Sequence, residues 1–170
     1  DADTDADTDA DTDSDTDADA DVDCDDEIGT GPSGPDCITQ ELSCGDGIVG
    51  STSGGTRTAD GASYQAWYCD VVSSGDYTGP ERVYRFSHPG ENQTATISLS
   101  SPCGELDLFA AYWEEDVCPT AANSTAECDG DSTSGDGQID IWNSSPRTYL
   151  IYVDGPSGDE ANFGLSISCN

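Results

Sequence analysis

The stretch TATISLS, residues 94–100, alternates small hydroxyl residues with apolar ones. Successive side chains of a strand point to opposite faces, so this pattern predicts a strand with one buried face. Similar runs, bounded by Gly, Pro, Asn and Asp, extend outward along the chain: ERVYRFS (81–87), LDLFAAYW (106–113), GQIDIW (137–142), RTYLIYVD (147–154), FGLSISC (163–169) and, more weakly, LSCGDGIVG (42–50) and QAWYCDVV (65–72). Short strands at such spacing predict an all-β, antiparallel β-sandwich.

The expected core consists of the apolar side chains of these runs, because no apolar period of 3.6 residues persists over three turns. The residues expected to point inward are Val83, Tyr84, Phe86, Ile97, Leu99, Leu106, Leu108, Ile139, Ile141, Leu150, Tyr152 and Phe163.

The chain is strongly acidic: 170 residues carry 36 acids against four arginines, for a net charge of −32. Nucleic-acid affinity depends on Lys and Arg neutralising phosphates, so nucleic acid is excluded as a partner. The charge instead favours cations such as Ca²⁺, or a high-salt habitat that screens self-repulsion. No apolar run is long enough to span a bilayer, so we expect no transmembrane segment.

Eight cysteines occur without a CxxC pair, beside a single histidine, His88. This pattern indicates disulfides rather than zinc ligands, and hence secretion into an oxidising environment. Eight cysteines allow 105 connectivities. From proximity, we expect Cys118–Cys128, Cys44–Cys69 and Cys37–Cys169. This leaves Cys24–Cys103 to tether the N-terminal segment to the sandwich, either within one subunit or between two.

Three segments follow one another along the chain. Residues 1–27 form an acidic repeat with aspartate at every odd position from Asp1 to Asp25, residues 28–36 form a Gly/Pro linker, and residues 37–170 form the sandwich. In an extended strand, every repeat aspartate falls on one face, and 26 residues reach ~85 Å. Three agents could order this repeat: strand addition to another subunit, Ca²⁺ bridging of Asp3, Asp5, Asp7, Asp9 and Asp11, or covalent glycans.

Several runs resemble the bacterial pre-peptidase C-terminal domain. They are GPERVYRF, TATISLSS, GELDLFAAY, the segment from Cys118 to Cys128, GQIDIW, RTYLIYVDG and NFGLSISC, and with the lead-in CGDGIVGSTSGGTR…YQAWYC the resemblance covers about residues 40–170. It implies a small jelly-roll-like sandwich that serves secreted proteins as an accessory module without catalysis. No peptidase precedes the domain in this sequence; the acidic repeat does.

Candidate metal ligands lie in DGDSTSGDGQID, which contains Asp129, Asp131, Asp136 and Asp140. Closely spaced aspartates in a Gly-rich loop can supply the oxygens that Ca²⁺ requires. The EF-hand pattern fails, because Ser134 stands where that loop needs glycine. A plain polar hairpin loop is the alternative. We expect no organic cofactor.

Two sets of glycosylation sites are possible. Hydroxyls recur along the neutral side of the repeat, at Thr4, Thr8, Thr12, Ser14 and Thr16, and would suit O-linked glycans. N-linked sequons begin at Asn92, Asn123 and Asn143, but these are chance matches if the source is bacterial.

We expect no enzymatic activity. A Ser–His–Asp triad would require His88, which lies in the sequence SHPGEN and is expected in an exposed turn. The sequence contains no GxSxG, and oxidised cysteines offer no thiol nucleophile.

Two functional hypotheses follow. The first is the repeating subunit of an extracellular filament or cell-surface appendage, a homopolymer joined head to tail through the acidic repeat. The alternative is a secreted accessory module that binds carbohydrate or protein, with the repeat as a spacer. Its candidate binding aromatics are Trp67, Tyr68, Tyr77, Trp113 and Trp142.

Overall fold

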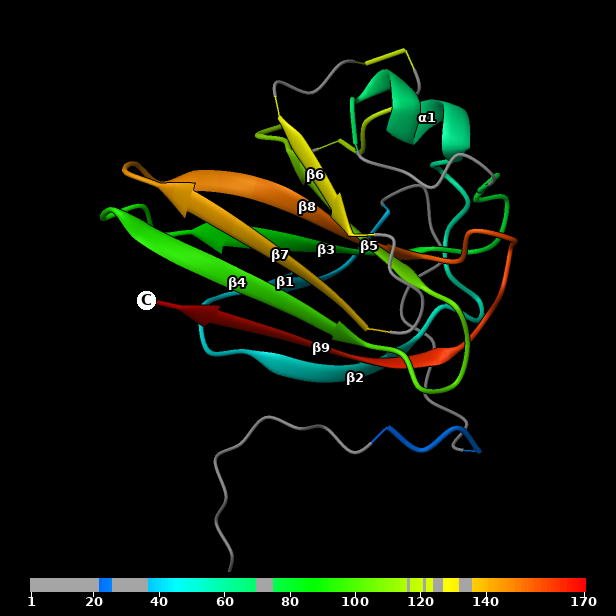
Figure 1. Ribbon diagram of the computed structural model, residues 1–170. Coiled ribbons are helices and arrows are strands. Elements are labelled where there is room, and N and C mark those ends of the chain that lie inside the picture. The colour runs from blue at the N-terminus through cyan, green and yellow to red at the C-terminus, as the bar shows by residue number, and fades with distance from the viewer. Residues whose placement is uncertain are drawn as a thin grey trace, which may run out of the picture.

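A computed structural model describes residues 22–25, 37–69, 75–115, 117–120, 122–123, 127–131 and 136–170. Two sheets pack face to face, with one short helix on the outer side of the larger sheet (Figure 1). The elements are β1 (Ile38–Leu42), β2 (Gly47–Ser51), α1 (Gly61–Ala66), β3 (Arg82–His88), β4 (Gln93–Ser100), β5 (Asp107–Tyr112), β6 (Cys128–Asp131), β7 (Asp136–Asn143), β8 (Arg147–Asp154) and β9 (Asn162–Cys169).

The larger sheet has the order β1-β3-β8-β5-β6 and the smaller one the order β2-β9-β4-β7. The predicted sandwich is therefore confirmed. The expectation of purely antiparallel pairing is wrong at one edge, where β1 runs parallel to β3. All the other pairings between described strands are antiparallel.

The sandwich has two cores instead of one, because the larger sheet is buried on both faces. Most of the predicted inward residues fill the core between the sheets. Val83, Leu150 and Tyr152 instead face a second core beneath α1, together with Tyr64 and Trp67. Burial on both faces explains why β5 and β8 are continuous apolar runs instead of alternating ones.

The strand predicted over QAWYCDVV is wrong where the structure describes it, because Gln65 and Ala66 complete α1; residues 70–72 lie outside the described part of the chain. Asp60 caps this helix, since its side chain accepts a hydrogen bond from the Ser63 amide at 2.7 Å. Six residues are too few to show a helical period in the sequence. The weak strand predicted over residues 42–50 is also divided, by a turn in which Gly45 adopts φ +90°.

Four disulfides are present. Cys24–Cys103 is the expected bond, but the other three are Cys37–Cys118, Cys44–Cys169 and Cys69–Cys128. The expected Cys118–Cys128, Cys44–Cys69 and Cys37–Cys169 pairs are therefore wrong. Proximity in sequence failed because strand register decides the pairing. Extending the β2–β9 register three residues beyond the pair Gly47 and Ser166 places Cys44 opposite Cys169.

Four disulfides indicate folding in an oxidising compartment outside the cytosol. Among the described residues, no helix has the length and apolar character needed to cross a bilayer.

Candidate functional site

The outer face of the smaller sheet carries small polar side chains. The alternation in β4 and β9 turns Ile and Leu inward and Ser and Thr outward. Hydrogen-bonded register then aligns the outward residues of β4 with those of β7, in the pairs Thr94–Trp142, Thr96–Asp140, Ser98–Gln138 and Ser100–Asp136. On the other side of β4, Ser168 lies beside Thr96 and Ser166 beside Ser98. The result is a sheet face with a dense array of hydroxyl groups.

Trp142 stands at one end of this face, on the edge strand β7, with 59% of its surface exposed. Of the five aromatic residues proposed for binding, Trp67, Tyr77 and Trp113 are buried and belong to the second core. Tyr68, which is 83% exposed, lies just after α1. This helix covers the face of the larger sheet that points away from the smaller sheet (Figure 1). Trp142 is therefore the one candidate aromatic that combines exposure with a hydroxyl-lined surface.

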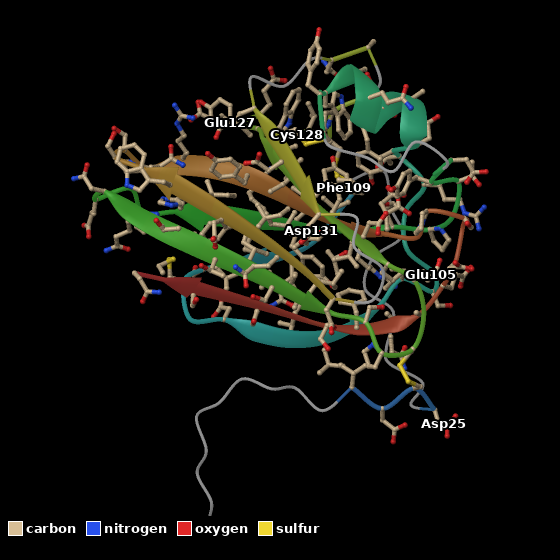
Figure 2. The ribbon with its side chains drawn as sticks, in the orientation of Figure 1. Asp25, Glu105, Phe109, Glu127, Cys128 and Asp131 are labelled. Carbon is tan, nitrogen blue, oxygen red and sulfur yellow. A yellow bond between two sulfur atoms is a disulfide. The ribbon has the colours of Figure 1, made fainter. Side chains whose placement is uncertain are left out.

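Among the described residues, the four aspartates proposed as Ca²⁺ ligands do not come together at one point, and Asp136 lies exposed at the start of β7. Asp140 Oδ1 accepts a hydrogen bond from Thr96 Oγ1 at 2.7 Å on the sheet face. Asp131, at the end of β6 beside β7, accepts one from the Gln138 amide at 2.8 Å (Figure 2). Burial raises the pKa of Asp129, with the charge of Glu127 adding to the effect. Outside residues 132–135 and the other undescribed segments, no three potential ligands gather into a metal site.

The proposed glycosylation sites fall into three groups. Asn92 and Asn123 are exposed. Asn143 is 6% exposed, and its Nδ2 donates a hydrogen bond to Tyr149 Oη at 2.8 Å, so the proposed glycan at Asn143 is incompatible with this fold. The hydroxyls proposed for O-glycans, and the repeat aspartates proposed for Ca²⁺, lie outside the described residues.

The sequence predicted an exposed turn for His88. This prediction is wrong, because the His88 side chain is buried. It ends β3 on the inward side, in phase with Tyr84 and Phe86. Its Nδ1 accepts from the Gly90 amide at 2.9 Å, so Nε2 carries the proton and donates to the Ile141 carbonyl at 3.2 Å. Both ring nitrogens are committed to the backbone, which leaves His88 without a role as a general base.

Sequence reasoning missed a cluster of buried carboxylates at the opposite end of the larger sheet. Asp107 and Asp154 are cross-strand partners and, with Glu81, are 0–1% exposed. Tyr77 Oη donates to Asp107 at 2.5 Å, and Tyr64 Oη donates to Asp154 at 2.9 Å. These bonds hold the α1 layer against the sheet. Since all three acids are buried, no substrate reaches them.

The hydrogen bonds of Glu81 are unevenly divided between its two oxygens. Oε1 accepts from Thr56 Oγ1 and from the amide and hydroxyl of Thr58, at 2.7–2.8 Å. Oε2 has no partner among the described residues. Neighbouring Arg82 directs its guanidinium to the carbonyls of Ser51 and Ser53.

Burial dominates the ionisation of this cluster. It raises the pKa of Asp154 to about 8, with help from the charges of Glu81 and Asp107, while the Tyr64 and Gly155 hydrogen bonds lower it. Burial likewise raises the pKa of Asp107, against the lowering effect of the Tyr77 hydrogen bond. The sequence contained a signal for this cluster: Asp107 begins the apolar strand β5, and Asp154 ends the apolar strand β8.

The acidic segment joins the sandwich at the end of the smaller sheet remote from Trp142. Cys24 is bonded to Cys103, which follows β4, and Asn162 Nδ2 donates to the Asp23 carbonyl at 2.8 Å. A shallow hollow of about 270 Å³ beside this attachment is lined by Ser51, Ser53 and Glu160 among others. Residues 22–25 lie below β2 and β9 in Figure 1. Figure 2 shows Asp25 far from Glu127, the ion-pair partner of Arg147 near the other end.

Three solved structures are similar to the chain. The pre-peptidase C-terminal domain of collagenase from Bacillus anthracis is 13% identical, covering 82% of this chain and 100% of that one, with a TM-score of 0.47. It is the kind of domain that the sequence resembles. PliG, a periplasmic inhibitor of g-type lysozyme from Aeromonas hydrophila, is 12% identical over 77% and 98%, with a TM-score of 0.40.

CorA, a surface-associated copper-binding protein of Methylomicrobium album BG8, is 8% identical over 78% of this chain and 98% of its own, with a TM-score of 0.44. No family model and no curated protein matches the sequence. The function therefore has to be sought in the residues of the chain itself.

Proposed function

We propose that this chain is a secreted, non-enzymatic module that binds neutral carbohydrate on the outer face of its smaller sheet, with the acidic repeat as a spacer. The observation that carries the proposal is the position of Trp142. It is an exposed aromatic side chain beside an array of hydroxyls, at the end of the sheet remote from the Cys24–Cys103 attachment.

The chemistry of this face suits a sugar. An indole ring offers a broad apolar surface against which the C–H groups of a pyranose can pack. The Ser and Thr hydroxyls each donate one hydrogen bond and accept others, as sugar hydroxyls do. The outward residues of β4 and β7 include two aspartates and no cation. Together with the net charge of −32, this disfavours polyanions.

The arrangement also suits presentation on a stalk. The acidic segment is attached to the fold at a fixed covalent point, Cys24, at the end of the smaller sheet remote from Trp142, so the attachment leaves the Trp142 end uncovered. Like charges along residues 1–27 repel one another and favour an extended spacer.

Retention on insoluble neutral polysaccharides tests the proposal. The wild-type protein, Trp142→Ala and Tyr68→Ala would be compared in pull-downs and affinity electrophoresis over a panel of neutral glucans, xylans, mannans and chitin. Tyr68→Ala is the matched control, because it removes an exposed aromatic residue away from the face. We expect wild type and Tyr68→Ala to be retained on at least one polymer and Trp142→Ala to be released. Absence of retention for the wild type, or equal retention of Trp142→Ala, would contradict the proposal.

A filament subunit is a second candidate function, favoured by the edges of the smaller sheet. Strands β2 and β7 each have one neighbour in that sheet, and Asp23 of the acidic segment is bonded to Asn162, the β9 residue that pairs with Ser51 of β2. An extended segment from a neighbouring copy could add to such an edge as a further strand. Negative-stain images with and without EDTA test this: filaments that survive EDTA support strand addition, filaments that dissolve support Ca²⁺ bridging, and single particles in both exclude a homopolymer.

A further inference from the structure

Asp140 lies on the hydroxyl-lined face two residues before Trp142 and is exposed. Its Oδ1 is held by Thr96 Oγ1 at 2.7 Å, from the cross-strand position. Among the described residues, its Oδ2 has no bonded partner. The carboxylate is therefore oriented by one bond and keeps acceptor capacity for a ligand.

The spacing between Asp140 and Trp142 along β7 matches the dimensions of a sugar ring. Residues i and i+2 of a strand project from the same face, roughly 7 Å apart. A pyranose that packs on the Trp142 indole thus brings the hydroxyls at its rim toward Asp140. An ionised carboxylate has only acceptor sites, about four lone pairs on two oxygens, so it can receive hydrogen bonds from two adjacent hydroxyls.

We propose that Asp140 determines the ligand class: it accepts hydrogen bonds from a pair of adjacent free hydroxyls on a neutral sugar packed against Trp142, and it repels sugars that carry a carboxylate or sulfate there. This inference rests on the proposed carbohydrate function. Hydrogen bonds to a charged acceptor are stronger than neutral ones, and a like charge in the same place is strongly unfavourable.

The ligand is an extended chain rather than a single sugar. Beyond Asp140, the outward hydroxyls of β4 continue through Ser98 to Ser100, and Ser166 and Ser168 of β9 flank them. From Thr94 to Ser100, β4 extends roughly 20 Å. Affinity should therefore rise with oligosaccharide length.

The test uses isothermal titration of neutral oligosaccharides of increasing length, taken from the polymer that retains the wild type. Asp140→Asn should lower the affinity roughly tenfold or more, the range expected for loss of a charged acceptor. Thr96→Ala should lower the affinity less, because this change removes the hydrogen bond that orients Asp140 but keeps its carboxylate. The matched control is Asp159→Asn, which neutralises an exposed aspartate in the loop between β8 and β9, away from this face.

Selectivity provides a readout that a purely structural role would not change. O-methylated oligosaccharides, whose hydroxyls no longer donate, should bind wild type and Asp140→Asn alike. Uronic-acid polymers should bind Asp140→Asn better than wild type. The inference fails if Asp140→Asn keeps wild-type affinity and selectivity while Trp142→Ala abolishes binding, and that result would leave the proposed function intact. If the wild type binds no neutral glycan, the proposed function fails and this inference fails with it.

Discussion

Replacing Asp154 by asparagine should remove much of the pH dependence of stability. The Asp154 carboxyl is fully buried, and burial raises its pKa in the folded protein from 3.8 to about 8. In the unfolded chain the same group titrates near its ordinary value. Between these two pH values the folded state holds a proton that the unfolded state has released. The stabilising contribution of this proton is complete below pH ~4 and is lost as the pH rises toward about 8.

The magnitude follows from proton linkage. One proton bound only in the folded state changes the free energy of unfolding by about 1.4 kcal/mol per pH unit. From pH 5 to pH 7, Asp154 alone should therefore lower the stability of the wild type by roughly 3 kcal/mol. Asparagine cannot ionise and keeps an oxygen that can accept from Tyr64, so Asp154→Asn should lack this slope.

The measurement is urea or guanidinium unfolding, with disulfides intact, at each pH between 4.5 and 8.5. Asp159→Asn is the control, since Asp159 is an exposed aspartate near the same end of β8. Asp107, whose pKa burial also raises, contributes a slope of the same sign in every variant. Parallel stability curves for wild type and Asp154→Asn would refute the reasoning. So would a wild type that gains stability from pH 5 to pH 7 relative to the variant.

Three further changes test local features by thermal or chemical unfolding. Gly90→Ala should destabilise by roughly 1–3 kcal/mol or more, because φ is +79° and a Cβ would lie 2.4 Å from the Ser145 carbonyl carbon; unchanged stability would contradict this. Asp60→Ala should cost about 1 kcal/mol through loss of the α1 cap, and no effect would mean that tertiary contacts alone hold the helix. Removing Cys44 and Cys169 together should cost roughly 2–5 kcal/mol, and a wild-type melting temperature would argue against a stabilising role.

The sequence predicted most strands because their patterns are local. RTYLIYVD has the same bounds as β8, and TATISLS lies within β4. The strand β6, CDGD, was missed because it carries no apolar pattern and depends on pairing with β5. The disulfides and the second core were missed for a related reason: both depend on which strands become neighbours, and no single segment encodes that.

The candidate site was partly accessible from sequence. In GQIDIW, the alternation that buries Ile139 and Ile141 turns Gln138, Asp140 and Trp142 outward, so the exposed tryptophan could have been singled out. The same alternation in β3 predicts an inward His88. The Asp140–Thr96 hydrogen bond could not be foreseen, since it requires the register between β4 and β7.

The disulfide pattern has a mechanical consequence. A pull between the segment before Cys24 and the end of β9 would travel along the backbone from Cys24 through Cys37 to Cys44, and then across the disulfide to Cys169. This covalent route contains about 20 peptide units, or roughly 70 Å when taut, against roughly 500 Å for an uncrosslinked chain between the same points. Most of the β-sandwich, including β7 and β8, lies off that route. Under tension the protein would therefore behave as a short tether of nearly fixed length, and the strands that form the hydroxyl-lined outer face would bear little of the load.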